Sequence, residues 1–161
     1  MLSKNLALDE IDKKIVEVVQ KKPNITHTKI AEYVKRSQPT VGMRIKRLEE
    51  TGALTYKAGF NLSKIDLFFG IVELQTNDPD RVYDIVSKCP YMIQTFRISG
   101  VNNFFIIIVS DRIEDLDKIV NHHFRSKPFI SNISIQMITD FLKDFVVPLD
   151  FEKEECDCLL N

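Results

Sequence analysis

The segment 35–47 carries five Lys or Arg residues and no Asp or Glu. We expect residues 38–50 to form a helix, in which each residue turns by about 100°. One face of this helix then carries Val41, Ile45 and Leu48, and Lys46 and Arg47 lie on roughly the opposite face. A helix that buries aliphatic side chains and presents cations suits the phosphate backbone and the major groove of DNA.

Several side chains along this helix are candidates for DNA contact. Lys and Arg neutralise phosphates, whereas Gln38 can pair with adenine and Met43 can pack on the methyl group of thymine. The predicted DNA-binding residues are Ser37, Gln38, Thr40, Met43, Arg44, Lys46 and Arg47.

A second group with chemical potential lies near the end of the chain. Cys156 and Cys158 are two residues apart among carboxylates. Thiolates and carboxylates bind zinc or a softer metal, and the tails of two chains in an oligomer would supply four thiolates. The alternative is an acidic tail whose cysteines bind nothing. Neighbouring carboxylates raise the pKa of a thiol, which argues against a reactive redox pair.

The remaining cysteine and the paired histidines have structural interpretations. Cys89 follows a predicted helix and is expected to fill the core. His122 and His123 would point about 100° apart on a helix, so we expect one beside the core and the other in solvent. The sequence contains no nucleophile–base pair, phosphate-binding glycine loop or zinc-peptidase motif, so catalysis has no sequence support.

Capping residues mark the helices that must position the basic helix. Asp9 is expected to begin the first helix, with Asp12 as its partner in a capping box. Thr26 is expected to begin the second helix and Ser37 the third. Gly52 follows the third helix, where a glycine commonly ends a helix.

The rest of the chain has a different pattern, in which strands and helices alternate. Apolar runs and period-two alternation predict strands, and amphipathic runs predict helices. The expected order is strand 67–74, helix 78–89, strands 91–99 and 104–109, helix 113–124 and strand 130–138. This order is that of the ferredoxin-like βαββαβ fold, with two helices on one face of an antiparallel sheet. Residues 53–60 are expected to form a wing strand or a linker.

Charge separates the two halves of the chain. Residues 1–58 have a net charge of +5 and residues 59–161 a net charge of −6, although the whole chain carries only −1. This asymmetry suits a DNA-binding half joined to a half with another role. We predict domains at 1–58 and 67–140, a linker at 59–66 and an acidic C-terminal extension at 141–161. No segment resembles a signal peptide or a membrane span, so a cytoplasmic protein without a membrane partner is expected.

Three segments of the N-terminal half resemble the winged helix-turn-helix of the Lrp/AsnC (feast/famine) regulators. They are Leu-Asp-Glu-Ile-Asp-Lys-Lys-Ile at 8–15, Lys-Ile-Ala-Glu-Tyr-Val at 29–34, and Thr-Val-Gly-Met-Arg-Ile-Lys-Arg-Leu-Glu-Glu-Thr-Gly-Ala-Leu at 40–54. All three occur in order and at the spacing of the family. The chain has Lys35-Arg36 where the family commonly has Gly-Leu.

The resemblance implies that residues 61–140 form the RAM domain, which carries dimerisation, higher assembly and effector binding in the family. The family's characteristic loop begins with glycine and often contains an aspartate. The corresponding residues here are Gly100, Val101, Asn102 and Asn103, the predicted effector-binding residues. Asn103 stands at the expected position of the aspartate, and an amide cannot neutralise an ammonium group. The alternative is a hairpin turn with no ligand.

The resemblance implies an α+β transcriptional regulator without a cofactor or a catalytic residue. Two protomers would pair through their sheet domains, assemble further into tetramers or octamers, and place two basic helices in successive major grooves of double-stranded DNA. A small effector such as an amino acid would modulate binding. Two alternatives stay open: an architectural protein that binds DNA without sequence preference, and an enzyme or sensor related to the siroheme decarboxylases, which act on a tetrapyrrole.

Overall fold

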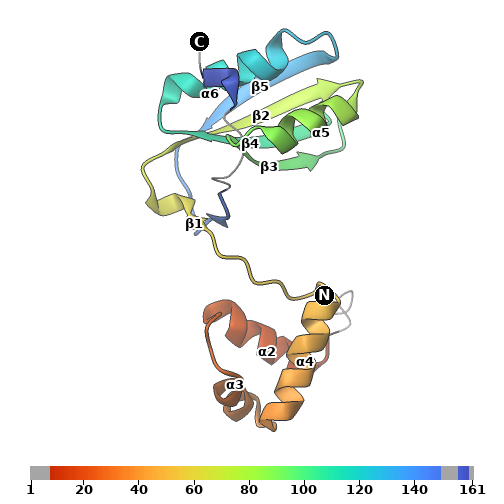
Figure 1. Ribbon diagram of the computed structural model, residues 1–161, viewed down its shortest axis with the longest axis vertical. Helices are drawn as coiled ribbons and strands as arrows, with labels where there is room; N and C mark the ends of the chain where they lie inside the picture. Colours follow the sequence, from red (N-terminus) through yellow and green to blue (C-terminus); the bar gives the residue numbers. More distant parts are fainter. Residues whose placement is uncertain (1–7, 150–155, 160–161) are drawn as a thin grey trace. The chain divides into compact units, whose positions relative to one another are not determined.

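The computed structural model describes residues 8–149 and 156–159. The chain divides into two compact units, Met1–Lys57 and Ala58–Asn161 (Figure 1). The N-terminal unit is helical and the C-terminal unit is built on a sheet, so the predicted α+β class is confirmed. No helix among the described residues combines the length and the apolar character needed to cross a membrane.

From residue 8 onward, the N-terminal unit contains three helices whose first turns are capped by side chains. They are α2 (Glu10–Lys21), α3 (His27–Val34) and α4 (Gln38–Glu50). The predicted caps are confirmed: Asp9 and Asp12 form a capping box, Thr26 accepts from the Lys29 backbone, and Ser37 accepts from the Thr40 backbone. Each cap satisfies backbone N–H groups that lack a partner within the helix.

Apolar side chains from all three helices meet in one small core. The predicted inner face of α4 is confirmed, because its three aliphatic residues are at most 3% exposed. The core residues are Ile15, Val19, Ile30, Ala31, Val34, Val41, Ile45, Leu48 and Leu54. Residues 53–59 form neither a helix nor a strand, so of the two alternatives expected for residues 53–60 they fit the linker and not the wing strand.

The turn between α3 and α4 contains a strained residue. Lys35 has a φ of 53°, in the left-handed region. This conformation lets the backbone N–H of Arg36 donate to the carbonyl of Ala31 at 3.0 Å, which closes the end of α3. A side chain in this region clashes with the following carbonyl, at a cost of about 1–2 kcal/mol. The lysine therefore occupies a position that favours glycine.

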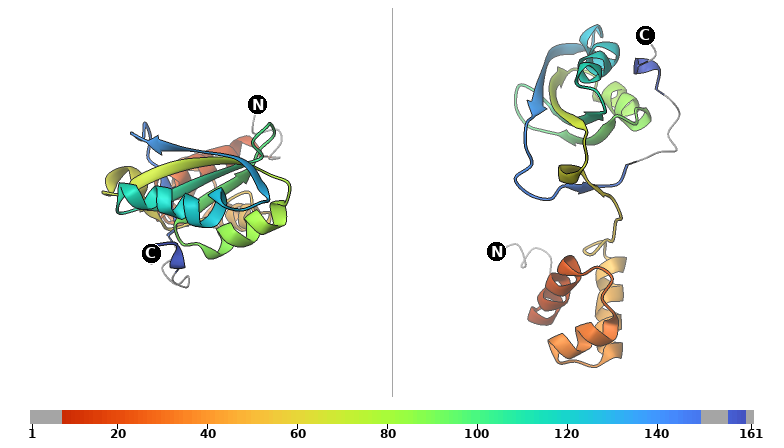
Figure 2. Two further views of the ribbon diagram at one scale, coloured as in Figure 1. Left: turned by 90° about the horizontal axis from the view of Figure 1, so that it is seen from above. Right: turned by 90° about the vertical axis from the view of Figure 1, so that its left-hand side faces the viewer.

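The C-terminal unit is built on a four-stranded antiparallel sheet with the order β3-β4-β2-β5. The strands are β2 (Phe68–Thr76), β3 (Met92–Arg97), β4 (Phe104–Ser110) and β5 (Ile130–Ile138). Helices α5 (Pro79–Lys88) and α6 (Ile113–Val120) cover one face of the sheet (Figure 2). The βαββαβ order and the ferredoxin-like arrangement are confirmed.

The two faces of the sheet have different environments. On the helix-covered face, Val72, Leu74, Ile106 and Ile108 are fully buried. On the open face, the paired strands place Phe96 beside Phe105 with ring centroids 6.0 Å apart, and Phe96 is 45% exposed. Since successive residues of a strand alternate between faces, Ile71 and Glu73 also lie on this open face.

Short elements close one end of the sheet domain. Strands β1 (Phe60–Asn61) and β6 (Val146–Val147) pair antiparallel, and η1 (Leu62–Lys64) follows β1. Leu62 is 1% exposed within a second core that includes Phe69 and Val109. Part of the predicted linker and the beginning of the predicted extension are therefore structured.

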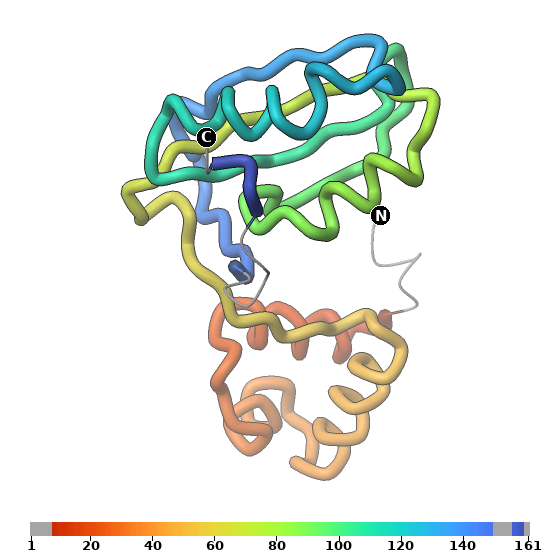
Figure 3. Tube along the Cα trace, turned by 45° about the horizontal axis from the view of Figure 1, so that its top comes forward, coloured from red at the N-terminus to blue at the C-terminus, as the bar shows by residue number. Residues whose placement is uncertain are grey.

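Two further turns bring distant segments together. Helix α6 continues as a wider π-helical turn, η2 (Asn121–Arg125). The short helix η3 (Asp157–Leu159) lies beside α6 (Figure 3). Cys158 is 4% exposed there, so this part of the predicted C-terminal extension packs on the main core of the sheet domain.

Replacing Lys35 with glycine removes the strain in the α3–α4 turn. We expect Lys35→Gly to raise the free energy of unfolding of the N-terminal unit by about 1 kcal/mol, measured by chemical denaturation of the full chain. Lys35→Ala is the matched control, because it removes the same ammonium group but keeps the Cβ atom. Equal stability of the two variants would show that the strain is absent.

Candidate DNA-binding and effector sites

The outward face of α4 presents the side chains that the sequence predicted for DNA contact. Met43 is 68% exposed, which is high for an apolar side chain. Gln38 lies exposed in the first turn, and the side chain of Lys46 is 75% exposed. The buried residues of α4 face the core that this helix shares with α2 and α3. The opposite face of α4 is therefore not covered by these two helices. The polar and apolar side chains along this face of α4 are thus available to a partner.

Two of the predicted residues bond to each other at the beginning of α4. The hydroxyl groups of Ser37 and Thr40 lie 2.7 Å apart. The Ser37 oxygen also accepts the backbone N–H of Thr40. Ser37 therefore acts first as a cap, and Thr40 is held in a defined orientation near the N-terminal end of the helix.

Two arginines of α4 form a charge network with α2. Arg44 donates to Asp9 at 2.6 Å and to Asp12 at 2.8 Å, and Arg47 donates to the other oxygen of Asp12. The Asp12 side chain is only 1% exposed, whereas those of Arg44 and Arg47 are 27% and 54% exposed. The backbone N–H of Asp12 and the Arg44 guanidinium hold the pKa of Asp9 at about 2. Arg44 thus links two helices, and Arg47 keeps half of its surface open.

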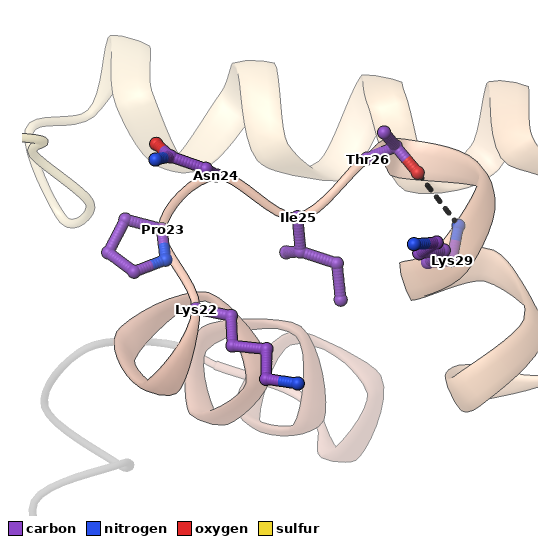
Figure 4. A pocket seen from close by; sticks show the side chains of 6 residues that line it. All are labelled: Lys22, Pro23, Asn24, Ile25, Thr26 and Lys29. Carbon is purple, nitrogen blue, oxygen red and sulfur yellow. Dashed lines mark hydrogen bonds between the residues drawn. The ribbon is translucent and has the colours of Figure 1, made fainter.

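A surface hollow of about 440 Å³ lies at the turn between α2 and α3 (Figure 4). Figure 4 also shows the hydrogen bond from the Lys29 backbone to the Thr26 hydroxyl that begins α3. The lining residues are Lys22, Pro23, Asn24, Ile25, Thr26 and Lys29. Two of these residues are lysines and none is acidic, so the rim of the hollow is positively charged.

The predicted effector loop lies between β3 and β4, where Asn103 has both ends of its amide engaged. Its oxygen accepts from the Thr76 backbone at 3.0 Å and its nitrogen donates to the Thr76 carbonyl at 2.8 Å. These two hydrogen bonds resemble those between paired strands, and they hold the loop against the end of β2. Gly100 has a φ of 135°, which favours glycine, and Val101 is 74% exposed. The hairpin interpretation is therefore compatible with the geometry, and both amide atoms of Asn103 are engaged by the Thr76 backbone.

A carboxylate that the sequence analysis missed lies beside this loop. Asn102 donates to Glu73 at 3.2 Å and accepts from Asn132 at 2.9 Å. Glu73 comes from β2 and Asn132 from β5, so three segments supply the cluster. The available signal was that Glu73 is the single acidic residue within the apolar strand 68–76. The open face of the sheet thus has a carboxylate where the loop itself has only amides.

The cysteines and one histidine converge elsewhere in the same unit. The ligand atoms of Cys89, His123, Cys156 and Cys158 all lie within 4.8 Å of one another. The prediction that Cys89 is buried is confirmed, but its part in a cluster was missed. The hydrogen bond from Cys158 lowers the pKa of the Cys89 thiol well below its usual range, although burial opposes this shift.

The paired histidines differ from the prediction. Their rings meet edge to face with centroids 4.7 Å apart, and both contact the C-terminal segment. His123 Nε2 lies 3.1 Å from the Cys156 sulfur, and His122 Nε2 lies 3.1 Å from Asp157. The expected separation between core and solvent is not observed, because residues 156 and 157 cover both rings and leave both histidines half-buried.

Comparisons with known proteins define the class. Residues 8–55 match a model of winged helix-turn-helix DNA-binding domains, and residues 68–147 match the Lrp/AsnC ligand-binding domain. The chain is 25% identical over 122 residues to the HTH-type transcriptional regulator FL11 of Pyrococcus furiosus, with 71% of this chain and 78% of the relative covered. It is 25% identical over 144 residues to the leucine-responsive regulatory protein of Rhizobium meliloti, with 85% and 92% covered.

Solved structures agree on the fold. The structure of B. subtilis LrpC matches with a TM-score of 0.74 at 23% identity, covering 84% of this chain and 97% of that one. A Neisseria meningitidis transcriptional regulator in complex with L-Met matches with a TM-score of 0.76 at 18% identity, covering 90% and 97%.

The two units therefore define a transcriptional regulator that joins a DNA-binding helix-turn-helix to a ligand-binding domain. The chain belongs to the Lrp/AsnC family, as its sequence motifs indicated.

Asn103 gives a direct test of the loop's architecture. We expect Asn103→Asp to lower the free energy of unfolding by about 1–3 kcal/mol at pH 7, because the carboxylate cannot donate to the Thr76 carbonyl and places a charge against it. Denaturation of the full chain measures this loss. The exposed neighbour supplies the control, since Val101→Ala should change stability by less than about 0.5 kcal/mol. An Asn103→Asp chain as stable as the original would show that the pairing with Thr76 contributes nothing.

Proposed function

We propose that α4 enters the major groove and reads a specific sequence. Gln38, Thr40 and Met43 would approach base edges, and Lys46 and Arg47 would contact phosphates. The observation that carries this proposal is the exposed face of α4, where a 68% exposed methionine lies among cations. An apolar side chain so exposed on a soluble surface is suited to contact a thymine methyl group.

Ser37 and Arg44 contribute to the same interface mainly by positioning it. Ser37 begins α4 and orients Thr40, whereas Arg44 holds α4 against α2 through Asp9 and Asp12. The exposed part of Arg44 remains available for a phosphate. This division separates residues that set the angle of the helix from residues that contact DNA.

We further propose that two protomers pair through the open face of the sheet. The aromatic pair Phe96 and Phe105 and the neighbouring Ile71 supply apolar surface there, and no helix of the described unit covers that face (Figure 2). Pairing would present two α4 helices to successive major grooves, and higher assemblies such as tetramers or octamers would build on the dimer. We place this activity in the cytoplasm and assign it no catalytic step.

The proposed effector site lies at the cluster of Glu73, Asn102 and Asn132, next to the loop 100–103. The Glu73 carboxylate can neutralise an ammonium group, and the two amides can bind a carboxylate or a polar side chain. An amino acid or another small zwitterion fits this chemistry. The Neisseria regulator with L-Met gives a precedent in a chain of the same fold.

Fluorescence anisotropy of the full chain with its own upstream DNA and a scrambled duplex, across a salt series, tests sequence-specific binding. A clear preference for the upstream duplex supports a specific regulator that controls its own gene. Equal and steeply salt-dependent binding to both would favour an architectural role. Absence of binding at low salt would overturn the proposed role of α4.

Lys46 and Lys88 form a matched pair for the contact itself. Their side chains are 75% and 73% exposed, and each pairs with a carboxylate four residues away on its own helix. We expect Lys46→Ala to weaken binding to every duplex and to reduce the salt slope by about 1 for each α4 in the complex. Lys88→Ala, in the sheet unit, should leave both quantities unchanged. Equal effects of the two substitutions would remove Lys46 from the interface.

A screen of amino acids by thermal shift and anisotropy tests the effector site. We expect any amino acid that alters stability or DNA affinity to lose at least about tenfold in affinity for Glu73→Gln, because the ammonium group loses its charged partner. Glu114→Gln is a control at an exposed carboxylate of α6. A response that survives Glu73→Gln would place the effector elsewhere.

A further inference from the structure

Four metal-ligating side chains converge from three separate parts of the sheet unit. Cys89 follows α5, His123 lies in η2, and Cys156 and Cys158 flank the beginning of η3. Their sulfur and nitrogen atoms lie within 4.8 Å of one another. The segments are 33 or more residues apart in sequence, so the fold and not the local sequence assembles the group.

The set and its spacing match one coordination chemistry. Zn²⁺ in structural sites is tetrahedral with Cys and His ligands, and bonds of about 2.3 Å to sulfur place adjacent sulfurs about 3.8 Å apart. The largest of the observed separations exceeds this value by about 1 Å, whereas the His123 nitrogen and the Cys156 sulfur, 3.1 Å apart, would move apart by about 0.5 Å. We propose that Cys89, His123, Cys156 and Cys158 bind one Zn²⁺ ion within a single chain. This site requires no second tail, unlike the four-thiolate site considered from the sequence.

Hydrogen bonds around the cluster favour ligation. The Tyr91 backbone donates to the Cys89 sulfur, and the Cys158 backbone donates to the Cys156 sulfur. Backbone N–H groups that donate to thiolate ligands stabilise their negative charge and orient them. The His123 ring already directs Nε2 at the Cys156 sulfur, 3.1 Å away, so its ligating nitrogen faces the centre of the group.

Burial makes the site closed. Cys89 is fully buried and Cys158 is 4% exposed, and both belong to the main core of the sheet domain. Four protein ligands leave no open position for a substrate or a water molecule, which is the arrangement of structural rather than catalytic zinc. Binding would displace the protons of the three thiols and fix the C-terminal residues 156–159 against α6.

Metal analysis of the full chain, purified without chelator, tests the proposal. We expect about one zinc ion per chain. His123→Gln and Cys156→Ser alter the two ligands that are only partly buried, so both variants should fold and lose most of the zinc. His122→Gln is the matched control, because His122 contacts His123 edge to face and pairs with Asp157 but lies outside the cluster. Zinc content should persist in this control.

Cobalt substitution gives a second readout. A tetrahedral Co²⁺ site with thiolate ligands should produce strong visible and charge-transfer absorption in the original chain and the His122→Gln control, and weak absorption in the other two variants. The proposal would be overturned by zinc content that is the same in all variants, by the absence of zinc and cobalt binding in the reduced protein, or by a disulfide that occupies the cluster in freshly prepared protein. The zinc and cobalt measurements do not depend on DNA binding, so their outcome neither supports nor contradicts the role proposed for α4.

Discussion

The buried carboxylate of Asp12 is the interaction on which the DNA-binding unit depends. A carboxylate with 1% exposure is costly unless charged partners replace its water, and Arg44 and Arg47 supply two of them. Its second oxygen also accepts the Asp9 backbone N–H in the capping box. The same side chain thus begins α2 and determines how α4 lies on it. Removing one partner of a buried ion pair typically costs about 3–5 kcal/mol, so this network helps the small core to fix the angle of α4 on α2.

Much of the fold could be predicted because its determinants are local. Caps at Asp9, Thr26 and Ser37 and the period of Val41, Ile45 and Leu48 depend on neighbours within one or two turns. The strand and helix order of the sheet unit follows from the same short-range patterns. Arg44 shows the limit of this reasoning: the sequence predicted it as a DNA contact, but only the packed α2 shows that Asp9 and Asp12 bind it.

The candidate sites of the sheet unit were less predictable for a related physical reason. Glu73, Asn102 and Asn132 become neighbours only when β5 pairs with β2, and Cys89 meets Cys158 only when the chain returns to the helix-covered face. The sequence indicated the loop 100–103 and the pair Cys156 and Cys158, which are the local halves of each cluster. The other members of each cluster come from distant segments and have no local signal that joins them: Glu73 and Asn132 in the first cluster, Cys89 and His123 in the second.

The pairing of β1 with β6 has a consequence for modularity. Phe60 faces Val147 in this two-stranded sheet, so the segment by which the chain enters the sheet unit lies beside the segment that follows β5. A Cβ atom on Gly59 would lie 2.5 Å from the Val147 carbonyl carbon, which shows how closely the two segments approach. A domain that is entered through a short strand pair at one end, outside its main core, can be joined to a different N-terminal module without opening that core. The helix-turn-helix and the sheet unit are therefore exchangeable parts in the sense that protein engineering requires.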